Sequence, residues 1–74
     1  MKVTLRQRKK GNKISLYLDI YDKGKREYEY LSLYLTPAPE KGSLSKAQKD
    51  ENKKILDLAE HIRRKKHLEL QNNI

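Results

Sequence analysis

The sequence predicts an α+β fold in which a three-stranded antiparallel β-sheet is backed by one long C-terminal α-helix. Apolar residues recur at every second position before the segment Thr36-Pro37-Ala38-Pro39 and at helical spacing after it. Two candidate two-residue turns, Gly11-Asn12 and Lys23-Gly24, divide the first part into a three-stranded meander. We therefore expect strands over residues about 2–9, 13–21 and 26–35, a linker over 36–44 and a helix over about 45–70.

The two turns fix how the three strands pair. Each strand alternates apolar with polar residues, so a shift of one residue would place an arginine or a tyrosine among the leucines. The hydrophobic pattern and the turn positions agree on one register. Its expected cross-strand pairs are Lys10–Lys13, Leu5–Leu18 and Val3–Ile20 around the first turn, and Asp22–Lys25, Leu16–Leu31 and Ile14–Leu33 around the second.

The predicted helix has a clear start and an apolar stripe. Ser45 and Gln48 form a capping-box pattern at its N-terminus. The residues Ile55, Leu58, Ala59 and Ile62 give one stripe that can cover the apolar sheet face, with Leu56 off the stripe. The basic run at 63–66 is interpreted as favourable to the dipole at the helix end, and a second phosphate contact is the alternative. Because no stop signal follows, we expect the chain to be part of a longer protein.

The same register gathers polar side chains on the sheet face that the helix leaves uncovered, here called the open face. All five tyrosines and the three arginines of the strands fall on it. The expected rows across the strands are Lys2–Tyr21–Arg26, Thr4–Asp19–Tyr28, Arg6–Tyr17–Tyr30, Arg8–Ser15–Ser32 and Lys10–Lys13–Tyr34. Glu27 and Glu29 fall on the apolar side instead, where we expect them to pair with cations of the helix.

The charge and composition of the chain favour some classes of protein and exclude others. The 18 Lys and Arg residues outnumber the 10 Asp and Glu residues, and the net charge of +8 predicts a polyanionic partner. The chain has no cysteine, no signal peptide and no apolar run of the roughly 20 residues that span a bilayer, which predicts a cytoplasmic protein without a membrane partner. No catalytic motif or metal-ligand spacing is found, and His61 and His67 are interpreted as surface residues. We therefore expect no enzymatic activity, cofactor, metal or small-molecule substrate.

These observations predict a module that binds double-stranded DNA through the open face. Arg6 and Arg8 flank the central strand and are expected to reach base edges, together with Tyr17 and Tyr30. Asp19 can orient a neighbouring arginine or accept from a cytosine amino group. The full set of expected DNA-binding residues is Thr4, Arg6, Arg8, Lys10, Lys13, Ser15, Tyr17, Asp19, Arg26, Tyr28 and Tyr30.

Two alternatives stay open on the residues alone. Tyrosines on a sheet can stack unpaired bases, so the open face could bind RNA or single-stranded nucleic acid. The first and third strands are free edges, so the chain could instead recruit a partner strand as a protein-interaction module.

Three segments carry a family resemblance. The runs at 14–21, 24–26 and 31–35, followed by the helical segment Leu58-Ala59-Glu60 and Ile62-Arg63, resemble the N-terminal arm-type DNA-binding domain of tyrosine recombinases. The resemblance is strongest to integrases of conjugative transposons from Bacteroides-like bacteria. It implies a sheet lying in the major groove, arm sites near the transposon ends, and other recombinase domains or subunits as partners at the nucleoid. It also implies that cleavage belongs to a separate catalytic domain, so none of these tyrosines is its nucleophile.

Overall fold

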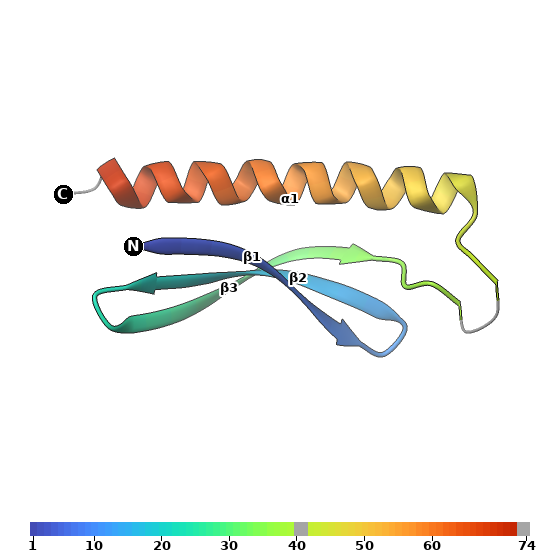
Figure 1. Ribbon diagram of the computed structural model, residues 1–74, viewed down its shortest axis with the longest axis horizontal. Helices are drawn as coiled ribbons and strands as arrows, with labels where there is room; N and C mark the ends of the chain where they lie inside the picture. Colours follow the sequence, from blue (N-terminus) through green and yellow to red (C-terminus); the bar gives the residue numbers. More distant parts are fainter. Residues whose placement is uncertain (40–41, 73–74) are drawn as a thin grey trace.

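A computed structural model describes residues 1–39 and 42–72. It contains strands β1 (Lys2–Lys10), β2 (Lys13–Asp22) and β3 (Lys25–Leu35), followed by helix α1 (Lys46–Asn72). The strands form one antiparallel sheet in the order β1-β2-β3, and α1 runs along one of its faces (Figure 1). This arrangement confirms the predicted fold class. Residues 40–41 of the expected linker, and residues 73–74, lie outside the described residues.

The two hairpin turns form as the sequence predicts. Gly11 has a φ of 59°, the conformation of the first position of a type II′ turn. Lys23 and Gly24 both have positive φ values, 50° and 80°, as a type I′ turn requires. Between β1 and β2 the pairing runs from Lys10 with Lys13 to Lys2 with Tyr21, so the expected register of this hairpin is confirmed.

The register between β2 and β3 changes part-way along the strands, which the sequence analysis did not predict. From Asp22 to Tyr17 the pairs are the expected ones, but Ser15 then pairs with Tyr34 instead of Ser32. The irregularity is a β-bulge, in which residues 31–33 of β3 stand opposite Leu16 alone. The expected pairs Leu16–Leu31 and Ile14–Leu33 are therefore wrong, and Ile14 pairs with Leu35.

Ser32 lies at the centre of this bulge with a φ of 56°, a left-handed conformation that non-glycine residues seldom adopt. We expect Ser32→Val to lower the free energy of unfolding by about 1–3 kcal/mol, because a β-branched side chain is strained at this φ. Ser32 is exposed, so the change removes no packing contact. Denaturant unfolding measures the effect, and Ser32→Gly, which accepts the same φ, is the control. Equal stability of the valine variant and the wild type would contradict the bulge.

The core lies between the sheet and α1. Leu16 and Leu18 of β2 are fully buried, and Val3, Ile20, Leu35 and Ala59 complete the buried apolar set. From α1, the residues Ile55, Leu56, Ile62 and Leu70 pack against this core. Leu58 is 49% exposed, so its expected place on the covering stripe is wrong, and Leu56 packs there instead. The helix is thus rotated relative to the predicted stripe.

Polar contacts fix the start of the helix beside the end of the sheet. The capping box is confirmed, because the Ser45 backbone N–H donates to Gln48 Oε1 at 3.0 Å and the Gln48 N–H donates to Ser45 Oγ at 3.2 Å. Asn52 then pairs with the backbone of Thr36 just after β3. Its Nδ2 donates to the Thr36 carbonyl and its Oδ1 accepts from the Thr36 N–H, both at 2.9 Å. This reciprocal pair holds the start of α1 beside the end of β3.

The basic run at 63–66 lies inside the helix and not at its end. Helix α1 continues to Asn72 and has no basic residue in its last turn, so the interpretation as a dipole-favouring end is wrong. Arg63 instead donates from Nε to Glu60 Oε1 at 2.6 Å and from Nη1 to the Val3 carbonyl of β1 at 3.4 Å. The hydrogen bond from Arg63 lowers the pKa of Glu60. Lys66 pairs with Glu29 at 3.3 Å, as expected for a glutamate on the apolar side.

Candidate nucleic-acid interface

The sheet face opposite α1 carries a continuous polar surface. The observed rows are Lys2–Tyr21–Arg26, Thr4–Asp19–Tyr28, Arg6–Tyr17–Tyr30 and Arg8–Ser15–Tyr34, with the pair Lys10–Lys13 at the hairpin end. The first three rows are the expected ones. The last two differ because the bulge moves Tyr34 to the place expected for Ser32. Since the bulge shifts the pairing by two residues, the paired side chains on either side of it keep their predicted faces.

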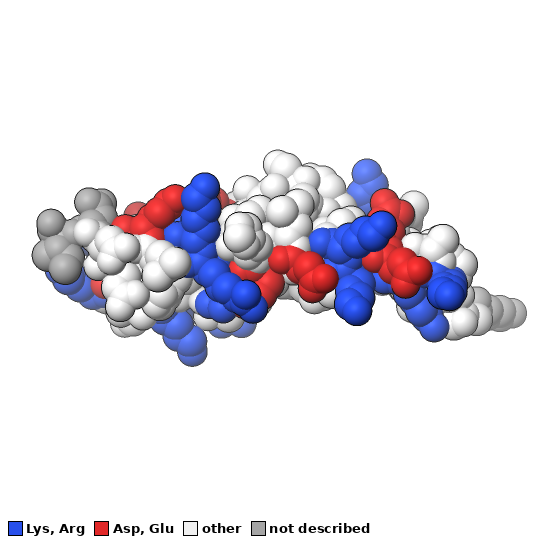
Figure 2. Space-filling model, turned by 90° about the horizontal axis from the view of Figure 1, so that it is seen from above, with Lys and Arg blue, Asp and Glu red and all other residues white. Residues whose placement is uncertain are grey.

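The charges on this face are mostly of one sign. Among the residues of these rows Asp19 is the single acidic side chain, and it is only 5% exposed. The helix side of the molecule is different, because lysines and arginines alternate with aspartates and glutamates over it (Figure 2). A surface of mixed sign attracts phosphates weakly, whereas an unbalanced basic surface attracts them strongly. The open face is therefore the better polyanion-binding surface of the two.

Asp19 sits between two arginines that come from the two outer strands. Arg6 of β1 donates from Nε to Asp19 Oδ2 at 2.7 Å. Arg26 of β3 approaches Asp19 Oδ1 with its Nε at 3.4 Å as an ion pair, and this oxygen has no hydrogen bond within residues 1–39 and 42–72. Both contacts use Nε, so the terminal N–H groups of each guanidinium are not used by Asp19. The geometry fits the expectation that Asp19 orients a neighbouring arginine.

These groups border a small hollow on the open face, here called the Asp19 hollow. Its volume is about 130 Å³, and its lining residues are Lys2, Thr4, Arg6, Asp19, Tyr21 and Arg26. The side chain of Asp19 is 6% exposed, whereas those of Arg6 and Arg26 are 50% and 55% exposed. A ligand entering this hollow therefore meets the arginine ends before the carboxylate.

Each tyrosine ring on the open face already has a neighbour. The ring of Tyr17 stacks on Tyr30 with centroids 5.2 Å apart, and it meets the ring of Tyr28 edge-on at 5.8 Å. Arg26 lies over the ring of Tyr21 at 5.6 Å, and Lys13 lies over that of Tyr34 at 5.3 Å. These contacts order the surface and hold two of its cations in place. They also occupy part of the ring surface that stacking of bases would need.

All the residues predicted to bind DNA lie on this one face, although contact with DNA stays a prediction for each of them. Thr4, Arg6, Asp19, Tyr28 and Arg26 gather around the Asp19 hollow or next to it. Lys2, Tyr21 and Tyr34 were absent from the predicted set but share the face. The alternation of apolar and polar residues within the strands had already placed these three residues on the open face, and that placement was the available signal that they could contact DNA.

Other kinds of site find no support in the described part of the chain. Across residues 1–39 and 42–72, His, Cys, Asp and Glu side chains form no group of three or more that could hold a metal ion. Helix α1 is too polar to cross a membrane. His61 is exposed as expected, whereas His67 is partly buried.

A basic sheet face opposite a single covering helix is an arrangement suited to a polyanion such as nucleic acid. Comparison with family models identifies the family to which the chain belongs. Residues 3–73 match the family described as the Arm DNA-binding domain, and the chain belongs to that family. The family occurs in tyrosine recombinases and integrases, so this chain is a DNA-binding domain of recombination or integration. Comparisons with curated proteins and with solved structures gave no match.

Proposed function

We propose that this domain binds arm-type sites on the double-stranded DNA of a mobile element, with its open face in the major groove. The parent protein that we propose is a tyrosine recombinase, of the kind encoded by conjugative transposons of Bacteroides-like bacteria. The domain itself is non-catalytic and acts at the nucleoid. The single observation that carries the proposal is the separation of charge, with cations and tyrosines on the open face and mixed charge over the helix.

The size of the sheet supports entry into the major groove. Neighbouring strands lie about 4.8 Å apart, so the outer strands of a three-stranded sheet are separated by about 10 Å. The major groove of B-DNA is about 12 Å wide and carries a distinct donor and acceptor pattern for each base pair. A twisted sheet of this width can follow the groove and bring side chains of its open face to the base edges.

Arg6 and Arg26 are the residues that we propose to read base edges. An arginine that reads guanine uses two parallel N–H groups directed at O6 and N7. Contact of both Nε atoms with Asp19 leaves the terminal N–H groups available and restricts the rotation of each side chain. The buried carboxylate therefore acts as a positioning group, and it reduces the entropy that the arginines lose on binding.

Binding at arm sites would tether the recombinase to a second DNA segment. A tether raises the effective concentration of the other domains at the crossover site, so a modest affinity of the small domain can strengthen the whole complex. The partners of the domain are then double-stranded DNA and the other domains or subunits of the recombinase complex.

Competition between nucleic acids tests this proposal. A preferred duplex is first selected from a randomised duplex library, and its binding is then competed with the matching single strands and with RNA. We expect the duplex to compete best, and the logarithm of the binding constant to fall steeply with the logarithm of salt concentration, by about 0.9 for each phosphate neutralised.

The competing proposals predict other results in the same experiment. Single strands or RNA that compete better than the duplex would favour base stacking on the open face, despite the neighbours that already occupy the tyrosine rings. Absence of binding to any nucleic acid would favour a protein-interaction module that uses the free edge of β1 or β3.

A further inference from the structure

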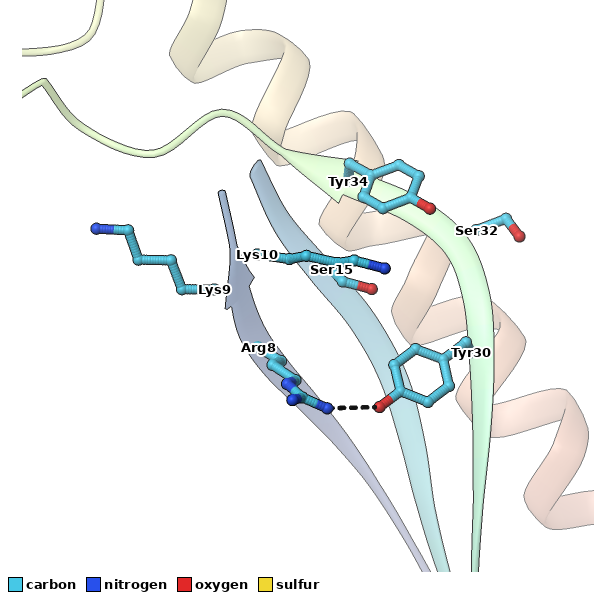
Figure 3. A pocket seen from close by; sticks show the side chains of 7 residues that line it. All are labelled: Arg8, Lys9, Lys10, Ser15, Tyr30, Ser32 and Tyr34. Carbon is cyan, nitrogen blue, oxygen red and sulfur yellow. Dashed lines mark hydrogen bonds between the residues drawn. The ribbon is translucent and has the colours of Figure 1, made fainter. Parts of the chain in front are cut away.

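A second and larger hollow lies at the bulged end of the open face, here called the bulge hollow. Its volume is about 350 Å³, and its lining residues are Arg8, Lys9, Lys10, Ser15, Tyr30, Ser32 and Tyr34. Figure 3 shows the side chains of Arg8, Lys10, Tyr30 and Tyr34 around the space above Ser15, whereas those of Lys9 and Ser32 point away. Ser15 is 5% exposed and forms the floor.

The bulge in β3 builds this hollow. Without it Ser32 would stand beside Ser15, but the two inserted residues put Tyr34 there. Tyr34 and Tyr30 then lie on either side of the bulge and form one wall, while Arg8 on β1 forms the opposite wall. Arg8 donates from Nη1 to the Tyr30 hydroxyl at 3.4 Å, which joins the two walls.

The polar groups of the two hollows differ in kind. The bulge hollow is lined by lysine, arginine and hydroxyl groups, all of which can donate hydrogen bonds, and by no carboxylate. The Asp19 hollow contains a carboxylate between its cations. Base edges present donors as well as acceptors, whereas a phosphate group presents acceptors only. A lining made of donors matches a phosphate.

We infer that the bulge hollow receives a backbone phosphate of the DNA, while the Asp19 hollow faces base edges. This inference rests on the proposed function and refines it, since it assigns Arg8 to the backbone and not to a base. The open face then has a direction. Its Arg26 end reads sequence, and its Tyr34 end anchors the backbone and sets the register of the domain along the groove.

Arg8→Gln tests the assignment with the selected duplex and a scrambled duplex of equal length. The change removes the charge but keeps a polar side chain of similar reach. We expect Arg8→Gln to weaken both duplexes by the same factor and to lower the salt slope by about 0.9, the value for one phosphate contact. Arg6→Gln, on the same strand and face, should instead weaken the selected duplex far more than the scrambled one. Lys54→Gln removes the same charge from α1 and should leave both measurements close to those of the wild type.

A chemical change in the DNA identifies the phosphate itself. Neutral methylphosphonate groups are placed one at a time along the selected duplex. We expect one position to weaken the wild type and to have no further effect on Arg8→Gln, because the partner is already lost. A wild type that fails to bind any duplex would overturn the proposed function together with this inference. A wild type that binds, with Arg8→Gln changing sequence preference and keeping the full salt slope, would overturn this inference alone.

Discussion

Leu18→Ala is expected to lower the free energy of unfolding by about 2–5 kcal/mol, the range for truncating a fully buried leucine. Leu18 is fully buried at the centre of β2 and packs with Val3 and Ile20 beneath the helix. Its removal would lose the transfer free energy of the side chain and leave a cavity that the sheet backbone cannot close. A chain of 74 residues has a small core, so its total stability lies near the lower end of about 5–15 kcal/mol.

Thermal unfolding measures this effect against a matched control. For a domain of this size each kcal/mol shifts the melting temperature by about 4–8 °C, so Leu18→Ala should shift it by at least about 8 °C. Leu68→Ala makes the same chemical change on α1 at a position that is 56% exposed, and its effect should stay within about 0.5 kcal/mol. Similar shifts for the two variants would mean that the core does not lie between β2 and α1 as described.

The hairpin of β1 and β2 shows how far the sequence determines this fold. A two-residue turn fixes which residues face each other, and the alternation of apolar and polar residues excludes a shift by one. Both constraints come from one continuous stretch of sequence, because the two strands are joined directly by the turn. The register from Lys10–Lys13 to Lys2–Tyr21 was therefore predictable pair by pair.

The bulge in β3 was not predictable from the same pattern. An insertion of two residues leaves the period-two alternation intact, so Leu33 and Leu35 still face the helix and Tyr34 still faces solvent. Only the pairing partners change. Ser32 gives no signal of its own, because glycine or asparagine is the residue that usually marks a positive φ.

The apolar stripe predicts the wrong rotation of the helix for a related reason. The inner face of α1 includes polar side chains that bind the sheet, such as Asn52 beside Thr36 and Arg63 beside the Val3 carbonyl. The apolar residues alone do not indicate these polar side chains, and they suggest an inward place for Leu58, which is exposed. For the open face, the sequence predicted which side chains share it. It could not predict that Asp19 is buried between two arginines. The burial of a short side chain depends on the way in which the long side chains of its neighbours fold over it.

Arg6→Ala is expected to weaken binding of the selected duplex by about 1–3 kcal/mol, roughly 5- to 150-fold, if Arg6 reads a base. The scrambled duplex should lose much less, because non-specific binding depends on phosphate neutralisation and one of many cations is removed. The ratio of the two affinities, measured at one salt concentration, is therefore the informative quantity. An unchanged ratio would remove Arg6 from base recognition.

Asp19→Asn separates positioning from direct contact. The change keeps the size of the side chain but removes the charge that holds Arg6 at 2.7 Å. Removing a negative charge from the face should strengthen binding to the scrambled duplex, and releasing the arginines should lower the ratio of selected to scrambled affinity. In the Arg6→Ala background the same change should reduce this ratio less, because one of the two arginines that it positions is already absent. If Asp19→Asn strengthened both duplexes equally in either background, Asp19 would act only by repelling phosphates, and the arginines would read bases without its help.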